Sequence, residues 1–293
     1  MKKIIIPFVI TVLLIACKED SKTNKDMIEK SNAWWSAAGI NPDDVMASVS
    51  LTVAESKRLI AKGIAQHPLV KQKLASGTII ITRGSTNTYI AEELVGLDAS
   101  HGQFVTGNIT PVKGLAIEFG GDKVPEIIII DGKRTEMPFK EALASLKEGD
   151  IVFKGGNLLN YDLKQVAVTV GAADFGTVGR IQPYTKEGPA HLIVPIGLEK
   201  QVYGDLNEYS RILATKIQKK GFIPQIIVHQ NAEIFTEIEA IKLFGQVEVI
   251  PYASGGLAGS EGGKSFAIYG SQAEIEKVLK QISEIQGEKA FIE

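Results

Sequence analysis

From residue 50 onward this chain alternates short apolar runs with longer helical patterns, and this alternation limits its fold more than any other feature. Runs such as Thr78–Thr82 (TIIIT) and Pro125–Ile130 (PEIIII) are rich in β-branched residues, which predicts buried strands. Neighbouring residues in these runs are both apolar, so we expect strands that are covered on both faces. The pattern therefore predicts an α/β fold, with a largely parallel sheet and helices on both faces.

Helical patterns lie between these runs. Thr52–Ala75 is predicted to be helical and to break before Pro68, because the proline ring clashes with the preceding turn. Further helices are predicted over 139–147, 205–220, 232–244 and 273–285. We interpret residues 34–204 as the main α/β domain.

Beyond Gly221 the order of predicted elements is strand, helix, strand, Gly-rich loop, strand and helix. This tighter pattern is typical of a mixed unit rather than of a continued series of parallel strands. We therefore interpret residues 205–293 as a smaller C-terminal α+β lobe.

The composition excludes several classes of protein. With 44% hydrophobic residues over 293 positions, the chain is too apolar to be disordered. Its 32 Lys and Arg against 34 Asp and Glu give a net charge of −2, so nothing indicates a nucleic-acid partner. Its single cysteine, Cys17, excludes an internal disulfide and a cysteine-cluster metal site. We expect no metal and no cofactor.

The N-terminus reads MKKIIIPFVITVLLIAC, in which two lysines precede an uncharged apolar run from Ile4 to Ala16. At about 1.5 Å per helical residue this run spans only about 20 Å, less than the roughly 30 Å hydrocarbon core of a bilayer. A short apolar run behind basic residues is the layout of a secretory signal rather than of a membrane span.

The run ends in Leu14-Ile15-Ala16-Cys17, which closely resembles the lipobox of bacterial lipoprotein signal peptides. The resemblance implies a cleaved signal peptide (1–16) and acylation of Cys17, including a chain such as palmitate, that anchors the protein in the lipid bilayer. Residues 17–33 would then form a polar tether. The implied location is the bacterial cell envelope, at the outer membrane or the cell surface. The alternative is an uncleaved anchor or an ordinary signal peptide.

Three turns rich in glycine and hydroxyl groups follow predicted strands. In an open parallel sheet, ligands gather at the carboxyl ends of the strands, where backbone N–H groups and helix N-termini favour an anion. We predict that these turns meet around a small anionic ligand, although each could equally be a plain connection. The candidate residues are Arg83, Gly84, Ser85, Thr86 and Asn87 in the first turn, Lys154, Gly155, Gly156 and Asn157 in the second, and Gly171, Gly176 and Thr177 in the third.

The order strand–GSTN–helix (Ile79 to Leu94), then KGGN after a strand, then a Gly-rich turn resembles the superfamily of ribose-5-phosphate isomerase, glucosamine-6-phosphate deaminase and the CoA transferases. The likeness covers about Thr52 to Lys200. It implies that Ser85, Thr86 and Asn87 hold a phosphate or another anion and that Lys154 neutralises it or an enolate. It also makes Glu199 the candidate general base, or the nucleophile towards an acyl-CoA.

The sequence thus predicts a membrane-anchored lipoprotein that binds a phosphorylated or carboxylated ligand, with isomerase or transferase chemistry implied by the resemblance. The alternative is a non-catalytic envelope lipoprotein that acts through contacts with a protein partner, which the sequence does not identify.

The segment Gly259 to Ser265 (GSEGGKS) approaches a phosphate-binding P-loop. The first glycine of that motif is missing, because Ala258 stands at its position, and the residues from Ser265 onward predict a strand where a helix is required. We expect a plain strand connection or a loop that closes over the main site.

Overall fold

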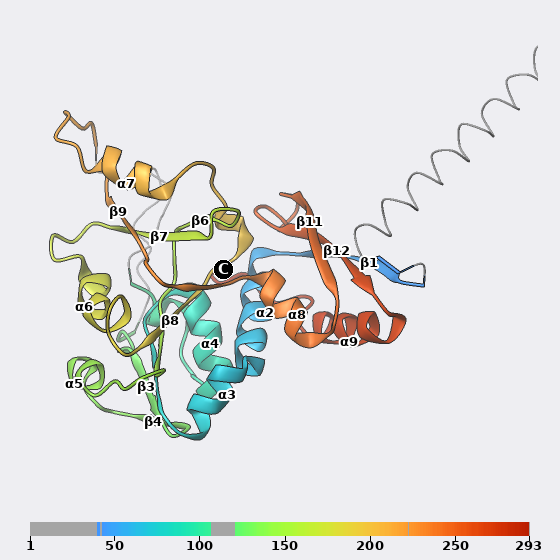
Figure 1. Ribbon diagram of the computed structural model, residues 1–293, viewed down its shortest axis with the longest axis horizontal. Helices are drawn as coiled ribbons and strands as arrows, with labels where there is room; N and C mark the ends of the chain where they lie inside the picture. The colour runs from blue at the N-terminus through green and yellow to red at the C-terminus, as the bar shows by residue number, and fades with distance from the viewer. Residues whose placement is uncertain (1–39, 42, 107–120, 222, 293) are drawn as a thin grey trace, which may run out of the picture.

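The computed structural model describes residues 40–41, 43–106, 121–221 and 223–292 (Figure 1). Within these ranges the chain is a mixed α/β structure, with eight α-helices, two 3₁₀ helices and 12 strands in three sheets. The predicted signal peptide, Cys17 and the tether lie outside the described residues. Among the described helices, none is both long enough and apolar enough to cross a lipid bilayer.

The described helices are α2 (Val53–Gln66), α3 (Pro68–Ala75), α4 (Ser85–Val95), α5 (Phe139–Ala144), α6 (Gly176–Thr185), α7 (Leu206–Leu213), α8 (Glu237–Phe244) and α9 (Gln272–Ser283). The 3₁₀ helices are η1 (His101–Phe104) and η2 (Leu198–Lys200). The predicted break before Pro68 is confirmed, because α2 ends at Gln66 and Pro68 opens α3, where the missing N–H of proline costs no hydrogen bond.

A six-stranded sheet forms the centre of the molecule. Its order is β10 (Glu233–Phe235), β8 (His191–Pro195), β5 (Ile151–Phe153), β2 (Thr78–Ile81), β3 (Ile127–Ile130) and β4 (Lys133–Thr135). The predicted α/β class is confirmed, but the sheet is mixed rather than largely parallel. Strands β10, β8, β5 and β2 run parallel, whereas β3 pairs antiparallel with both β2 and β4. The two-residue turn Asp131-Gly132 has positive φ at both positions, which closes β3 and β4 into an antiparallel hairpin.

Two smaller antiparallel sheets flank the central one. The first has the order β1 (Val45–Leu51), β12 (Lys264–Gly270) and β11 (Glu248–Ser254). The second has the order β6 (Leu158–Asn160), β7 (Gln165–Val170) and β9 (Gln225–Val228). The predicted C-terminal lobe is not confirmed, because the segment 205–293 supplies β9, β10 and β12 to three different sheets.

Two predicted helices are shorter than expected. The helix predicted over 205–220 ends at Leu213, and the residues from Ala214 to Gly221 are exposed, so no packing supports a helix there. The helix predicted over 232–244 begins only at Glu237. Its first residues form β10 instead, because pairing with β8 outweighs local helix propensity.

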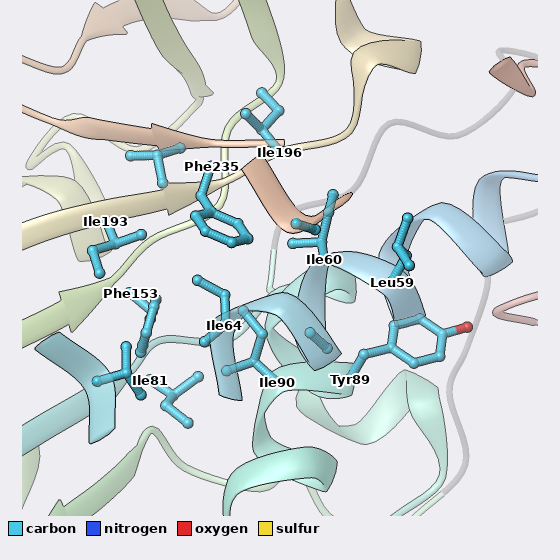
Figure 2. Close-up of a cluster of buried hydrophobic side chains, with 14 of the residues drawn as sticks. Leu59, Ile60, Ile64, Ile81, Tyr89, Ile90, Phe153, Ile193, Ile196 and Phe235 are labelled. Carbon is cyan, nitrogen blue, oxygen red and sulfur yellow. The ribbon is translucent and has the colours of Figure 1, made fainter. Parts of the chain in front are cut away.

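The core lies between the six-stranded sheet and helices α2 and α4. Figure 2 shows Phe153 and Ile193 from the strands facing Ile64 of α2 and Ile90 of α4, and all four are fully buried. On the opposite side of the sheet, α6 packs Ile181 beside Leu192. Burial of each such side chain stabilises the fold by roughly 1.5–3 kcal/mol. The two helix layers fix the position of the loops at the strand ends (Figure 1).

Candidate functional site

The three glycine-rich turns line one cavity of about 560 Å³. This volume suits a small molecule. The cavity wall contains Lys154 and all the predicted ligand-binding residues, which are Arg83, Gly84, Ser85, Thr86, Asn87, Gly155, Gly156, Asn157, Gly171, Gly176 and Thr177. The structure therefore brings together segments that lie up to 94 positions apart, from Arg83 to Thr177.

Two of the turns meet because β2 and β5 are parallel neighbours in the central sheet, so their carboxyl ends lie side by side. The third turn follows β7, which belongs to a separate antiparallel sheet. It reaches the cavity because the second turn is bonded to β7. The Asn157 N–H donates to the Ala167 carbonyl at 2.8 Å, and the Asn157 Oδ1 accepts from the Thr169 N–H at 3.0 Å.

Helices α4 and α6 begin at the cavity, and of the two only α6 has a carboxylate bonded at its N-terminus. The N-cap residues, Gly84 for α4 and Phe175 for α6, make no side-chain cap hydrogen bond, but at the start of α6 the Gly176 N–H donates to Asp174 Oδ1 at 3.0 Å. By contrast, hydroxyl or carboxyl side chains cap α2, α7, α8 and α9, through Thr52, Asp205, Thr236 and Ser271. Backbone N–H groups at the start of α4 are therefore open to an anion, whereas the Asp174 carboxylate already occupies one of those at α6.

Three lysines, Lys57 from α2, Lys154 from the second turn and Lys200 from η2, also line the cavity. Lys154 Nζ donates to the Gly155 carbonyl at 3.3 Å, and Lys200 Nζ donates to the Gly156 carbonyl at 2.9 Å. Lys57 is only 9% exposed, and its Nζ lies 5.3 Å from the centre of the Phe291 ring. Within the described ranges, none of the three forms an ion pair with a carboxylate within 4.0 Å.

The environment of the lysines disfavours their charged form. Burial, with the charge of Lys200, lowers the pKa of Lys57 to about 8, although the charge of Glu199 partly opposes this. Burial and Lys200 also lower the pKa of Lys154 to about 8. Both side chains are therefore mostly protonated at pH 7. A bound anion would compensate for the hydration that these ammonium groups lose on burial.

Some polar residues of the first two turns are bonded to other parts of the protein, whereas others are free. The buried Asn87 amide donates to the Thr82 carbonyl at 2.7 Å and to the Phe153 carbonyl at 3.3 Å, which ties the ends of β2 and β5 together. Arg83 is balanced by Glu126, whose Oε1 lies 3.4 Å from Arg83 Nε. The hydroxyls of Ser85 and Thr86 bond no other described residue, so they are free to bind a ligand.

Glu199 lies behind the cavity wall rather than on it, although its neighbour Lys200 is a wall residue. The Glu199 carboxylate folds back over Gly197, where a Cβ atom would collide with its Oε2, and this buried oxygen has no hydrogen-bond partner among the described residues. Burial and the charge of Glu199 raise the pKa of the fully buried Glu237 well above its usual range. Glu237 Oε2 accepts from the Leu198 N–H at 3.0 Å. Two carboxyl groups therefore adjoin the lysine side of the cavity.

The C-terminal segment closes part of the cavity with Phe291 and Ile292. The Phe291 ring stacks on His101 with 4.6 Å between ring centres, and the Phe291 carbonyl lies 3.0 Å from His101 Nδ1. Nearby, Arg58 Nε donates to Glu288 at 2.9 Å. The apolar surface that this segment adds suits a ligand with both an anionic and an apolar part.

The sequence predictions did not include Lys57, Lys200, Phe291 or Ile292. The signal for Lys57 was present, because Lys57, Ile60, Ala61 and Ile64 follow the spacing of one helix face. A lysine on the apolar face of a buried helix is a candidate functional residue. Nothing local to Phe291 and Ile292 indicated a cavity, because only long-range packing brings the C-terminal segment there.

Two other sequence features lie outside the cavity. The P-loop-like segment leads into strand β12 rather than a helix, and its residues are not part of the cavity wall. Within the described residues, no group of three or more His, Cys, Asp and Glu side chains is arranged to hold a metal ion.

No family model, no curated relative and no solved structure matches this chain.

Proposed function

We propose that this chain is a lipoprotein of the bacterial cell envelope that binds a small phosphorylated or carboxylated ligand in the basic cavity. The observation that carries the proposal is Lys57, which is nine-tenths buried at the cavity wall without a carboxylate within ion-pair distance among the described residues. Burying a cation that has no such partner costs several kcal/mol, so the site fits an anion that supplies the missing charge. The open N-terminus of α4 supports the same ligand class.

The experiment is a thermal-shift screen of the chain from Ser31 onward against phosphosugars, organic acids and nucleotides. A ligand present at about 100 times its Kd should add about 2.7 kcal/mol to the free energy of unfolding. For a domain of this size that raises the Tm by about 5–10 °C. A complete lack of response to all anions, at concentrations up to several millimolar, would reject the proposal.

Isomerase or transferase chemistry is the second candidate function. It is supported by the position of the Glu199 and Glu237 carboxyl groups beside the lysine side of the cavity, and by the pKa of Glu237, which burial and the charge of Glu199 raise well above its usual range. The same screen separates the two candidates. A catalyst converts the stabilising ligand, so NMR spectra of the ligand recovered after incubation should show a new compound, whereas a binding protein returns it unchanged.

The lipid anchor on Cys17 is tested by Cys17→Ser in a bacterial host. The wild-type chain should incorporate an alkyne-labelled palmitate, because the thiol is the only site for the thioether that precedes cleavage. The Cys17→Ser chain should lose the label and keep its signal peptide, as measured by the intact mass. Equal labelling of both chains, or no label on the wild type, would contradict the anchor.

A further inference from the structure

A segment rich in lysine and isoleucine joins α7 to β9 at one end of the molecule, the upper left of Figure 1. We call residues 211–221 and 223–225 the basic tip. It carries the exposed cations Arg211, Lys216, Lys219 and Lys220, and the chain has no acidic residue between Glu208 and Glu233. Three isoleucines in the tip are also exposed: Ile212 at 50%, Ile217 at 69% and Ile223 at 38%.

These side chains make only local contacts. Lys219 Nζ donates to the Leu213 carbonyl at 2.5 Å, and Arg211 Nε donates to the Asn207 carbonyl at 3.4 Å, both within the tip or its adjoining helix. Within the described chain, no carboxylate pairs with any of the four cations. Exposed isoleucines cost solubility, and clustered like charges repel one another, so neither feature stabilises the domain.

The tip also differs in charge from the rest of the chain. The protein has a net charge of −2, so four positive charges at the tip leave −6 on the remainder. An anionic surface therefore attracts this end of the molecule and repels most of the rest, which gives any encounter a defined orientation.

We propose that the basic tip docks on an anionic lipid bilayer, with its cations at the headgroups and its isoleucines in the acyl boundary. Basic residues interleaved with aliphatic ones are typical of segments that lie in a membrane interface. An acidic protein would satisfy the cations but offers no general reason for three exposed isoleucines among them. The inference is independent of the ligand in the cavity and of the acylation of Cys17.

Docking would also orient the cavity. Gln225, the last residue of the tip, is also the first residue of strand β9, and it pairs with Val170 of β7. Val170 and the turn that follows it, from Gly171 to Thr177, belong to the cavity wall. The base of the tip therefore adjoins the third turn, so a docked tip would hold this side of the cavity near the membrane surface.

The test uses the full chain with Cys17→Ser, which makes an introduced cysteine the only thiol. Ile217→Cys carries an environment-sensitive nitrobenzoxadiazole label. The matched control is Leu257→Cys, which is 85% exposed in the loop between β11 and β12. Each protein is mixed with vesicles of phosphatidylcholine alone, or of phosphatidylcholine with about one third phosphatidylglycerol.

We expect the label at 217 to brighten about twofold or more with the anionic vesicles, and to lose most of this gain in high salt. The label at 257 should change little with either kind of vesicle. Replacing Lys216, Lys219 and Lys220 together by glutamine should remove most of the gain at 217 with the anionic vesicles, a local signal that does not depend on membrane binding by the N-terminal apolar run.

An unchanged signal at 217, or an equal rise at 257, would overturn the proposal. A rise at 217 with soluble polyglutamate but not with vesicles would assign the tip to an acidic protein and overturn it as well. Because the chain in this experiment cannot be acylated at Cys17, failure of the lipid anchor would leave these outcomes unaffected.

Discussion

Lys57→Met is expected to abolish ligand-induced stabilisation and, at the same time, to make the ligand-free protein more stable. The substitution keeps the aliphatic stem of the side chain and removes a cation that is 9% exposed and has no ion pair within the described chain. Replacing buried charge by an apolar side chain of similar volume is often stabilising by about 1–4 kcal/mol. A substitution that raises the stability of the protein but abolishes ligand binding is typical of a functional residue.

The pH dependence of this stabilisation follows from the lowered pKa of Lys57. Below pH 8 the lysine is protonated in both the folded and the unfolded chain, and the difference between its ordinary value of 10.5 and about 8 corresponds to about 3 kcal/mol lost on folding. As the pH rises above 8, the folded chain releases this proton while the unfolded chain still holds it, so the cost of folding falls. The cost disappears near pH 10.5, where the unfolded chain releases its proton as well. The pKa of about 8 already includes the opposing charge of Glu199, so we expect Lys57→Met to add about 1–3 kcal/mol at pH 7 and almost nothing near pH 10.5.

The measurements are urea unfolding at several pH values and thermal shift with every anion that stabilises the wild type. The matched control is Lys62→Met on the same helix, where Lys62 pairs with Glu284 at 3.3 Å on the surface. This control should keep the ligand response and change the free energy of unfolding by no more than about 1 kcal/mol. If Lys57→Met kept the full ligand response, the cavity would not be the anion site.

Replacement by valine is expected to affect the two adjacent glycines of the second turn differently: Gly156→Val should destabilise the fold, whereas Gly155→Val should remove ligand binding. A Cβ atom at Gly155 would meet nothing within 4 Å, because it would point into open space. A Cβ atom at Gly156 would lie 2.9 Å from both Ile196 Cδ1 and Val166 Cγ2, and 3.1 Å from the Ala167 carbonyl oxygen. Both glycines line the cavity, yet only Gly156 is required for packing.

We therefore expect Gly156→Val to lower the free energy of unfolding by about 3 kcal/mol or more, or to prevent folding, because the two aliphatic neighbours cannot both move away. Gly155→Val should leave the Tm within about 2 °C of the wild type and remove the ligand response, since its methyl groups would occupy ligand space. Thermal unfolding with and without the ligand measures both effects. A stable Gly155→Val protein that binds normally would show that the ligand does not approach this turn.

The features that the sequence predicted correctly depend on short-range chemistry. The break between α2 and α3 follows from Pro68, whose ring cannot continue the preceding helix. The three cavity turns were also recognisable, because a turn that exposes backbone N–H groups requires glycine and small hydroxyl residues within a few positions. Each of these signals is complete within about ten residues of the chain.

The features that the sequence did not predict depend on pairing between distant segments. Strand β12 pairs with β1 across more than 200 positions, and β10 forms where local propensity favours a helix. Both pairings depend on which strand has a free edge when the sheets assemble. The local sequence pattern of a segment does not contain this information. The same reason explains why the strands of residues 205–293 are distributed over three sheets.

For the cavity, the sequence alone determined the residue types that can bind an anion, because glycine, serine, threonine and lysine carry that chemistry wherever they are placed. Only the tertiary structure decided that the three turns share a cavity, that Lys57 faces it from α2, and that Phe291 and Ile292 close part of it. The physical reason is that backbone conformation is set by neighbours in sequence, whereas the electrostatic environment of a charge is set by whatever chain segments fold around it.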